Sequence, residues 1–493
     1  MSNAVRYEFP PPEHKHIFGP WTAGQLAIAI VVLGAAVFGI IRPSPSVLRV
    51  TLAVGIAVAV LVPVAVPWRG RIVTEWAPIA WAYARARLAG RTDYRSAAPR
   101  LGTTAAGRVA LPAEVGAVEF LAHPHNGAVL GVAVDRRAGL YTGVVEVDSP
   151  SFLLEDTHRQ EELMARWGVL LARLVASGTH VHRLQWVVRT APDDGNGLRN
   201  YLKRVRAGDL EEASAVVRSY LELVRLSGPA SSGHTTLLVV QLSSRHSTRA
   251  IRAAGGGDQG ACAVLAEAME TLADSLDGVD VTVRRRLGVR EYQGIIRTAF
   301  DPDALATLNV LANLHPDREW GSDAPWPYAT EERWGYYRTA DHAWHRSFDL
   351  VLPMTDVPAD WFVPLMLDGG VSRTVSMTLK GVPRQEANRE VKRALTRIRA
   401  DEERKEQLGQ LATAEDDKRE TAAARRMREL AEGHAVMVYA VTVTVTAPDL
   451  ATLERAFRSM DDLAGQSYCE LRLLEGQQAT AFTWTLPLGR GLE

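Results

Sequence analysis

Two apolar runs near the start of the chain decide what fold the sequence predicts: 23-AGQLAIAIVVLGAAVFGII-41 and 47-VLRVTLAVGIAVAVLVPVAV-66. As helices with a rise of about 1.5 Å per residue, they would span roughly 28 and 30 Å, the thickness of the hydrocarbon core of a bilayer. The linker between them, 42-RPSPS-46, is short enough only for a tight reversal. The sequence therefore predicts a transmembrane helical hairpin within residues 21–68.

The few polar residues of the two runs fit this interpretation. Gln25 and Arg49 each lie near the start of a run, where their side chains can reach the headgroup region. A cleaved signal peptide and the buried core hairpin of a soluble protein are the alternatives. A signal peptide starts closer to the N-terminus and has a shorter apolar region, and here a second full-length run follows the first.

Positive charges predict the orientation of the hairpin. Arg6 and Lys15 precede the first run, and the turn between the runs holds only Arg42. The arginines that follow the second run include Arg69, Arg71, Arg85, Arg87 and Arg91. The positive-inside rule then predicts a multi-pass protein of the cytoplasmic (inner) membrane with both termini in the cytoplasm.

The same arginines lie on or beside a predicted helix over residues 71–89 that also carries Trp76 and Trp81. Such a helix can lie on the membrane with its arginines toward anionic lipid headgroups. The alternative is that it is the first core helix of the soluble part.

Composition limits the function classes. The chain has 493 residues, 47% of them hydrophobic, which is enough for more than one domain with a buried core. Its formal net charge of −1 provides no global basic field for nucleic acid, so we expect no direct sequence-specific nucleic-acid binding. The two cysteines, Cys262 and Cys469, exclude a disulfide framework and fit a reducing compartment.

The fold class expected is α+β, with the hairpin followed by a cytoplasmic mixed α/β region. The predicted parts are a cytoplasmic arm (1–20), the hairpin (21–68), a basic juxtamembrane helix and linker (69–112), a first cytoplasmic α/β domain (113–314) and a second α+β unit (315–493). In the first domain, strands are expected at 115–121, 127–134, 140–147, 182–188, 235–242 and 279–285, and helices at 157–177, 209–227, 259–276 and 291–299. In the second unit, strands are expected at 348–353, 372–380, 435–446 and 469–474, and a helix at 450–463.

The segment 384–432 is rich in Glu, Arg, Ala and Lys, contains no proline, and has one internal glycine, Gly409. Its apolar residues form only a thin stripe, which is typical of an exposed helix. The sequence leaves open whether this segment is one long helix or a helical hairpin broken near Gly409.

No motif for nucleotide or metal chemistry is complete. The stretch 228-GPASSGHT-235 has the spacing of a phosphate loop, but it has His234 in place of the lysine and precedes a strand. Gly255–Gly257 predicts a flexible loop, although the start of the following helix could hold an anion. The paired histidines His123/His125 and His342/His345 (flanked by Asp341 and Asp349), and the stretch 193-DDGNG-197, lack the spacings of zinc and calcium sites.

Two other clusters favour structural roles. Trp320, Trp326, Trp334 and Trp344 are expected to pack in the core more than to form an aromatic binding platform. Arg284–Arg286 is expected to be a solvated face. No nucleophile motif such as G-x-S-x-G occurs. We therefore expect no catalytic, cofactor-binding or metal residues, and no enzyme.

Several motifs together carry a resemblance to a known family. They are the arm ending 18-FGP-20, the hairpin, 70-GRIVTEWAP-78, the exit 94-YRS-96, the long charged segment, and the end with Phe482 and 486-LPLG-489. The front resembles actinobacterial PrgI-like two-helix membrane proteins of type IV secretion and conjugation systems. The body resembles the N-terminal, non-motor domain of the large conjugative ATPase.

This resemblance implies a non-catalytic component of a type IV secretion-like translocation machine. It would anchor and dock a separate P-loop ATPase within an oligomeric membrane complex. An accessory membrane protein of a type VII secretion system is the alternative within secretion. A membrane-anchored transferase is the alternative from another class, and 301-DPD-303 is its only candidate acidic motif.

Overall fold

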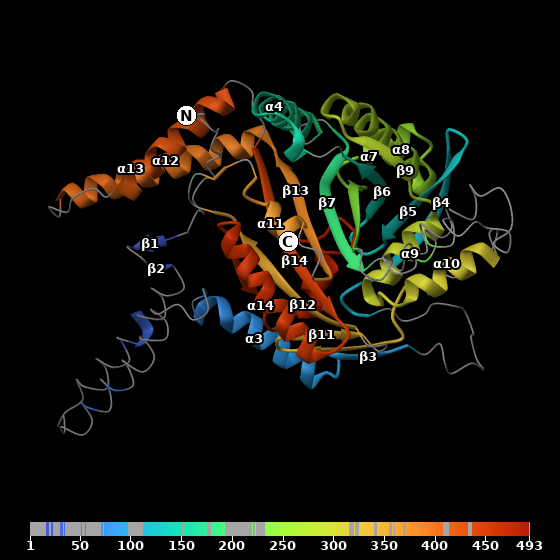
Figure 1. Ribbon diagram of the computed structural model, residues 1–493. Coiled ribbons are helices and arrows are strands. Elements are labelled where there is room, and N and C mark those ends of the chain that lie inside the picture. Colours follow the sequence, from blue (N-terminus) through green and yellow to red (C-terminus); the bar gives the residue numbers. More distant parts are fainter. Residues whose placement is uncertain are drawn as a thin grey trace. The chain divides into compact units, whose positions relative to one another are not determined.

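In the computed structural model (Figure 1), the chain divides into two compact units. The larger comprises Asp93–Leu474 and Gln478–Glu493 with Met1–Phe9, and the smaller comprises Pro10–Thr92 with Glu475–Gln477. The structure describes residues 16–18, 21–22, 30–32, 34, 51, 55, 71, 73–96, 112–149, 152–174, 179–192, 219, 222, 232–314, 320, 325–339, 343–353, 357–358, 360–367, 371–407, 414–431 and 436–492.

The larger unit is built on a single antiparallel sheet of 13 described strands. The order along the sheet is β3-β10-β11-β12-β14-β13-β7-β8-β6-β5-β4, with β15 also paired to β12 and β9 also paired to β6. Strands from both predicted units, 113–314 and 315–493, contribute to it. The two cytoplasmic units predicted from the sequence therefore share one sheet, which belongs to the larger compact unit.

The described elements follow the same order twice along the chain. The first repeat contains β4 (Val118–His125), β5 (Ala128–Asp135), β6 (Leu140–Asp148), α4 (Thr157–Leu174), β7 (Val181–Pro192), β8 (Ser232–Ser243), α7 (Thr248–Ala253), α8 (Gly257–Leu276), β9 (Thr282–Arg286) and α9 (Val289–Phe300). Helix α10 (Ala304–Leu314) leads into the second repeat, and β3 (Asp93–Arg95) pairs at its edge. The second repeat contains β10 (Ala329–Arg333), β11 (Tyr336–Thr339), β12 (Ala343–Val351), α11 (Val363–Leu367), β13 (Arg373–Val382), α12 (Arg384–Gln407), α13 (Ala414–Ala431), β14 (Val436–Ala447), α14 (Leu450–Gln466), β15 (Glu470–Leu473) and α15 (Gln478–Trp484).

The pairings of the strands confirm that the repeats are structurally equivalent. In the first repeat, β6 pairs with β5, with β8 and with the short strand β9. In the second repeat, β12 pairs in the same way with β11, with β14 and with the short strand β15. Asp280 and Tyr468 precede those short strands, and both have a left-handed φ of 56°. Since β7 and β13 pair antiparallel, a pseudo-twofold axis perpendicular to the sheet passes near the pair Val187–Ser376.

Successive side chains along each strand point to opposite faces of the sheet, and other elements pack on both faces. On one face, β6, β7 and β8 pack against α4 and α8, and β12, β13 and β14 pack against α14 and the residues around α11. On the other face, α9, α15 and the residues that follow α15 form a third apolar cluster with β5, β6, β7 and β8. Helices or the chain end therefore cover most of both faces of the sheet, and Val144, Val239 and Val443 have no exposed surface.

The C-terminal residues form a strap across the second face of the sheet. Gln241 on β8 donates to the carbonyl of Leu488 at 2.9 Å, and Thr378 on β13 donates to the carbonyl of Arg490 at 2.6 Å. Gly489 has a positive φ of 67°, and a Cβ there would lie 2.5 Å from the Gln241 amide nitrogen. Glycine is therefore required where the strap approaches β8.

Gln185, on β7, is the main polar anchor of the strap. Its amide nitrogen lies 2.9 and 3.0 Å from the carbonyl oxygens of Trp484 and Leu486, and 2.8 Å from the hydroxyl of Ser376 on β13. Its carbonyl oxygen accepts from the backbone N–H of Gly489 at 2.8 Å. One fully buried side chain thus connects both repeats with the end of the chain.

The structure decides the open question about residues 384–432. They form two helices, α12 and α13, that pack against each other as a hairpin inserted between β13 and β14. At the base of the hairpin, Ala387 and Val391 pack against Leu430, and Arg384 donates to the Leu430 carbonyl at 3.2 Å. Figure 1 shows the hairpin projecting from the end of the two strands.

In the smaller unit, β1 (His16–Phe18) pairs with β2 (Trp21–Thr22), and α3 (Val73–Leu88) falls within the helix predicted at 71–89. The Arg71 guanidinium lies 5.7 Å from the ring centroid of Trp76, which is buried. This cation–π contact fixes the start of α3.

The prediction of a transmembrane hairpin requires correction. Among the described residues, no helix is both long enough and apolar enough to cross a membrane. The predicted runs, 23–41 and 47–66, lie almost entirely outside the described residues. The 20-residue helix α8 carries four acidic side chains and packs its apolar face on the sheet, and α10 has only 11 residues. The fold class is therefore a large antiparallel sheet with helices, and the multi-pass inner-membrane localisation is not supported.

Most of the other predicted elements are present with shifted ends. The strands expected at 140–147 and 235–242 correspond to β6 and β8, and the helix expected at 259–276 corresponds to α8. Nine described α-helices and strands were not predicted from the sequence: β1, β2, β3, α7, α10, β10, β11, α11 and α15. The helix predicted at 209–227 lies outside the described residues except for Ser219 and Glu222.

Replacing Gln185 with leucine should strongly lower the free energy of unfolding. The substitution leaves the buried N–H of Gly489 without its acceptor and removes the hydrogen bonds from Gln185 to Ser376 and to the strap carbonyls, so we expect the free energy of unfolding to fall by about 3 kcal/mol in urea titrations. Gln259→Leu, at an exposed position of α8, is the matched control and should change it by less than about 0.5 kcal/mol. Equal effects of the two variants would show that the strap does not stabilise the fold.

The buried carboxyl of Glu332, on β10, should make the stability of the fold depend on pH. It accepts from the backbone N–H of Ala479 at 3.0 Å, and burial raises the pKa of its carboxyl from 4.5 to about 7. The folded state therefore holds its proton more tightly than the unfolded chain, and this contribution to stability is lost as pH rises from about 4.5 to 7. Glu332→Gln should stabilise the protein by roughly 2 kcal/mol at pH 8 and leave it unchanged at pH 4, measured by thermal unfolding. Glu331→Gln, on the same strand, should give no gain at pH 8, and a gain there would contradict the assignment.

Candidate interaction site

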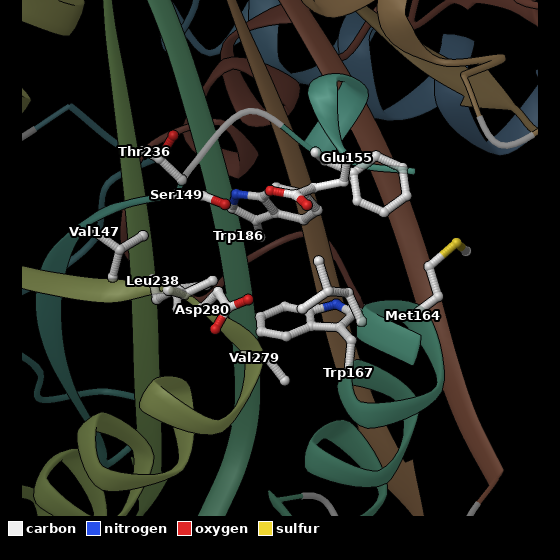
Figure 2. A pocket seen from close by; sticks show the side chains of 13 residues that line it. Val147, Ser149, Glu155, Met164, Trp167, Trp186, Thr236, Leu238, Val279 and Asp280 are labelled. Atoms are coloured by element: carbon white, nitrogen blue, oxygen red, sulfur yellow. The ribbon is translucent and has the colours of Figure 1, made fainter. Parts of the chain in front are cut away.

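An apolar cavity of about 270 Å³ lies on the first face of the sheet, in the first repeat. Trp186 of β7 and Trp167 of α4 form two of its walls, with ring centroids 6.4 Å apart at an interplanar angle of 65° (Figure 2). The remaining lining residues are Val147, Ser149, Phe152, Glu155, Leu163, Met164, Thr236, Leu238, Val279, Asp280 and Val281. This lining suits an apolar or aromatic group better than a charged one.

The two sides of the cavity are tied together by charged groups at its rim. Arg159 of α4 donates to Glu162 at 2.8 Å and also to the carboxylate of Asp280, which follows the 3-10 helix Asp277–Val279. Arg166 donates to the carbonyl of Gly278 at 3.2 Å. Hydrogen bonds from Arg159, and then from Arg166, lower the pKa of the Glu162 carboxyl. These contacts join α4 to the segment that leads into β9.

The cavity residues were not predicted from the sequence. Trp186 lies in the strand expected at 182–188, where alternation places it on the same face as the buried Leu184 and next to Thr236 and Leu238 of β8. It keeps 37% of its surface exposed. A tryptophan in a central strand was a usable signal, because such positions are normally covered.

The paired histidines, whose spacings are not those of a zinc site, lie in separate places. The rings of His123 and His125 lie 6.4 Å apart, and His125 Nε2 lies 3.2 Å from a carboxylate oxygen of Glu270. His345 is fully buried between Thr339 and Thr446, and burial lowers its pKa to about 3, so it is neutral at pH 7. Within the described part of the chain, no three His, Cys, Asp or Glu side chains are grouped so as to hold a metal ion.

The glycine stretches also take structural positions. Gly233–Thr235 lies inside β8, so it does not form a phosphate-binding turn before a helix. Gly255–Gly257 links α7 to α8 with three positive φ angles. His342, Asp341 and the stretch 193–197 lie outside the described residues.

Both cysteines are buried and free, and burial raises their pKa to about 11 for Cys262 and about 12 for Cys469. Thiols with such pKa values are protonated at neutral pH and react slowly. Asp301, of the D-x-D motif, follows α9 and pairs with Arg297 at 3.3 Å.

The tryptophans of 315–346 take separate positions. Trp326 is buried against Phe120 and Phe300, Trp320 lies under the guanidinium of Arg290 at 5.4 Å, and Trp344 lies under that of Arg338 at 4.9 Å. They do not share a surface that could serve as a platform. Contact of Arg85 and Arg87, at the end of α3, with lipid headgroups stays a prediction.

The arginine run 284–286 is held by one buried carboxylate. Arg284 and Arg285 lie 3.3 and 2.6 Å from the two oxygens of Glu146, whose side chain is 8% exposed. Since both guanidinium groups remain more than half exposed, the pairs contribute to the edge of the sheet without forming a basic patch.

The fold and this site define a protein built on one antiparallel sheet flanked by helices, with an apolar cavity between α4 and the sheet. Residues 230–350 match the model of a family described as "EccE: Putative type VII ESX secretion system translocon, EccE". The matched region runs from β8 to β12 and includes the cavity residues Thr236, Leu238 and Val279–Val281. No curated protein matches the chain.

This match concerns type VII secretion and therefore supports the alternative expectation. The assignment to type IV secretion and conjugation, including the PrgI label, is corrected. That assignment depended on the order of the apolar and charged segments along the chain and on their composition. Unrelated membrane-associated machines can share such a pattern. The likeness of the body to the non-motor domain of a conjugative ATPase stays a prediction.

A double-mutant cycle tests the role of the arginine run. Glu146→Ala and Arg285→Ala should show a coupling of about 1 kcal/mol in urea unfolding, which decreases at high salt because Arg285 is partly solvated. The pair Glu146→Ala and Arg286→Ala is the control and should show none. Absence of coupling in the first cycle would mean that Glu146 does not hold the run.

Proposed function

We propose that this chain is a non-catalytic component of a type VII secretion translocon. The family match over residues 230–350 carries the proposal, because the matched region includes the core strand β8 and the helices α8 and α9 on both faces of the sheet. The match thus covers elements that are central to the fold.

The positions of the chemically capable side chains support a non-catalytic role. His345, Cys262 and Cys469 are buried in apolar or neutral surroundings, and Asp301 is paired with Arg297. They lie on separate elements: His345 on β12, Cys262 on α8, Cys469 just before β15 and Asp301 just after α9. A catalytic site instead needs such groups within hydrogen-bond reach of one another.

The hairpin α12–α13 is the element best suited to reach another protein. Among the described residues of the hairpin, those at its base, Ala387, Val391 and Leu430, pack against Val382 of β13 and Val436 of β14. Its helices carry closely spaced charges of both signs, such as 401-DEERKE-406 and 415-EDDKRE-420. We include in the proposal a separate P-loop ATPase and an oligomeric complex as its partners, with this hairpin as a contact.

Deletion and complementation in the native host test the proposal. Loss of the chain should abolish secretion of type VII substrates, and the full chain should restore it, as measured by quantitative mass spectrometry of the culture medium. Proteins exported by the general secretory pathway are the internal control and should not change.

Cross-linking followed by purification of the tagged full chain should recover other components of the type VII system. Normal type VII secretion in the deletion strain would overturn the proposal. Recovery of conjugation proteins alone, or turnover of a lipid-linked substrate by the purified chain, would also do so.

A further inference from the structure

The internal repeat allows the cavity to be compared with its counterpart in the same molecule. Asp280 and Tyr468 each stand two residues before a residue, Thr282 or Glu470, that pairs with Asp148 of β6 or Val351 of β12. Val145 and Phe348, three residues earlier on those strands, are therefore equivalent. Val145 lies opposite Leu238, and Phe348 lies opposite Val443. Val443 is therefore the equivalent of Leu238, and counting along the strands makes Val441 the equivalent of Thr236. By the same correspondence between β7–β8 and β13–β14, Val375 is the equivalent of Trp186.

The equivalent positions differ in how they are covered. Trp186 is 37% exposed and Thr236 is half-buried, whereas Val375 and Val441 are 6% and 4% exposed. The same face of the same pair of strands is thus sealed in the second repeat and open in the first.

The chain's own residues 360–367 seal the second repeat. Trp361, Phe362 and Met366 pack on the cluster that contains Val375 and Val443, and Leu365 is fully buried in it. This short segment, which includes α11, presents two aromatic side chains and then two aliphatic ones to the sheet.

In the first repeat, α4 occupies the corresponding place in the chain but leaves the cavity beside Trp167 and Trp186. A dry cavity of about 150 Å³ is large enough to bind benzene, so about 270 Å³ can hold an aromatic side chain. At the rim, one ion pair joins Arg159 of α4 to Asp280, which itself lines the cavity.

We propose that this cavity receives aromatic and aliphatic side chains of a partner polypeptide. A short segment of the partner covers β7 and β8 in the way that residues 360–367 cover β13 and β14. Residues 360–367 indicate the chemistry expected of the partner segment: two adjacent aromatic residues followed three residues later by an aliphatic one. This inference does not depend on the proposed role in secretion.

The chain's own plug sequence is the probe that tests the inference. A fluorescein-labelled peptide of residues 357–367, VPADWFVPLML, extended by a lysine tag for solubility, is titrated with the full-length protein and followed by fluorescence anisotropy. We expect saturable binding. A peptide with alanine in place of Trp361, Phe362 and Leu365 should bind at least 10-fold more weakly.

Variants of the protein locate the binding. Thr236→Trp fills the cavity, and Trp186→Ala removes one of its walls; each should weaken binding at least 10-fold. Thr271→Trp, at an exposed position of α8, is the matched control and should leave binding unchanged. Circular dichroism checks that each variant is folded. If one of the two cavity variants fails to fold, the other still tests the inference.

Three results would overturn the inference. Equal binding of the plug peptide and its alanine version, or unchanged binding in both folded cavity variants, would show that the cavity is not a site for such side chains. Binding of decanoate that is lost in Thr236→Trp, without peptide binding, would assign the cavity to a small apolar ligand. Self-association in sedimentation velocity that is lost in Thr236→Trp would assign it to a second copy of the chain.

Discussion

The antiparallel pairing of β7 with β13 is the contact on which the larger unit depends. It joins two equivalent sets of strands into one sheet and places the pseudo-twofold axis near Val187 and Ser376, both buried. Because these strands lie in the centre of the sheet, their side chains need cover on both faces. The helices after β8 and β14 supply one cover. Helix α9, helix α15 and the C-terminal strap supply the other.

The strap explains why the buried centre contains so many polar groups. A segment without regular secondary structure brings backbone N–H and C=O groups into the core, and each of them needs a partner. Gln185, Gln241 and Thr378 provide those partners from three adjacent strands. The same requirement explains why glycine occurs at position 489, where the backbone has a positive φ and lies against Gln241.

The two repeats share their framework and differ in what covers it. Asp280 and Tyr468 keep the same left-handed backbone conformation, although their side chains have unrelated chemistry. By contrast, Trp186 and Val375 occupy equivalent positions with very different exposure. A duplicated fold therefore carries one sealed surface and one open surface, and the open one is available for binding.

The sequence by itself determined the strands with clear alternation, such as β6, β8 and β14, and the amphipathic helices α8 and α14, because periodicity reports which face is buried. It also indicated that Gly233–Thr235 precedes no helix and that 384–432 is helical. It predicted a transmembrane hairpin, and no described helix could span a membrane. It also misassigned the secretion class, because hydropathy and segment order do not identify a partner or a system. Only the tertiary structure decided the helical hairpin, the duplication and the cavity between Trp167 and Trp186. These features depend on strand pairing and packing between residues far apart in the chain, and local sequence periodicity carries no information about such contacts.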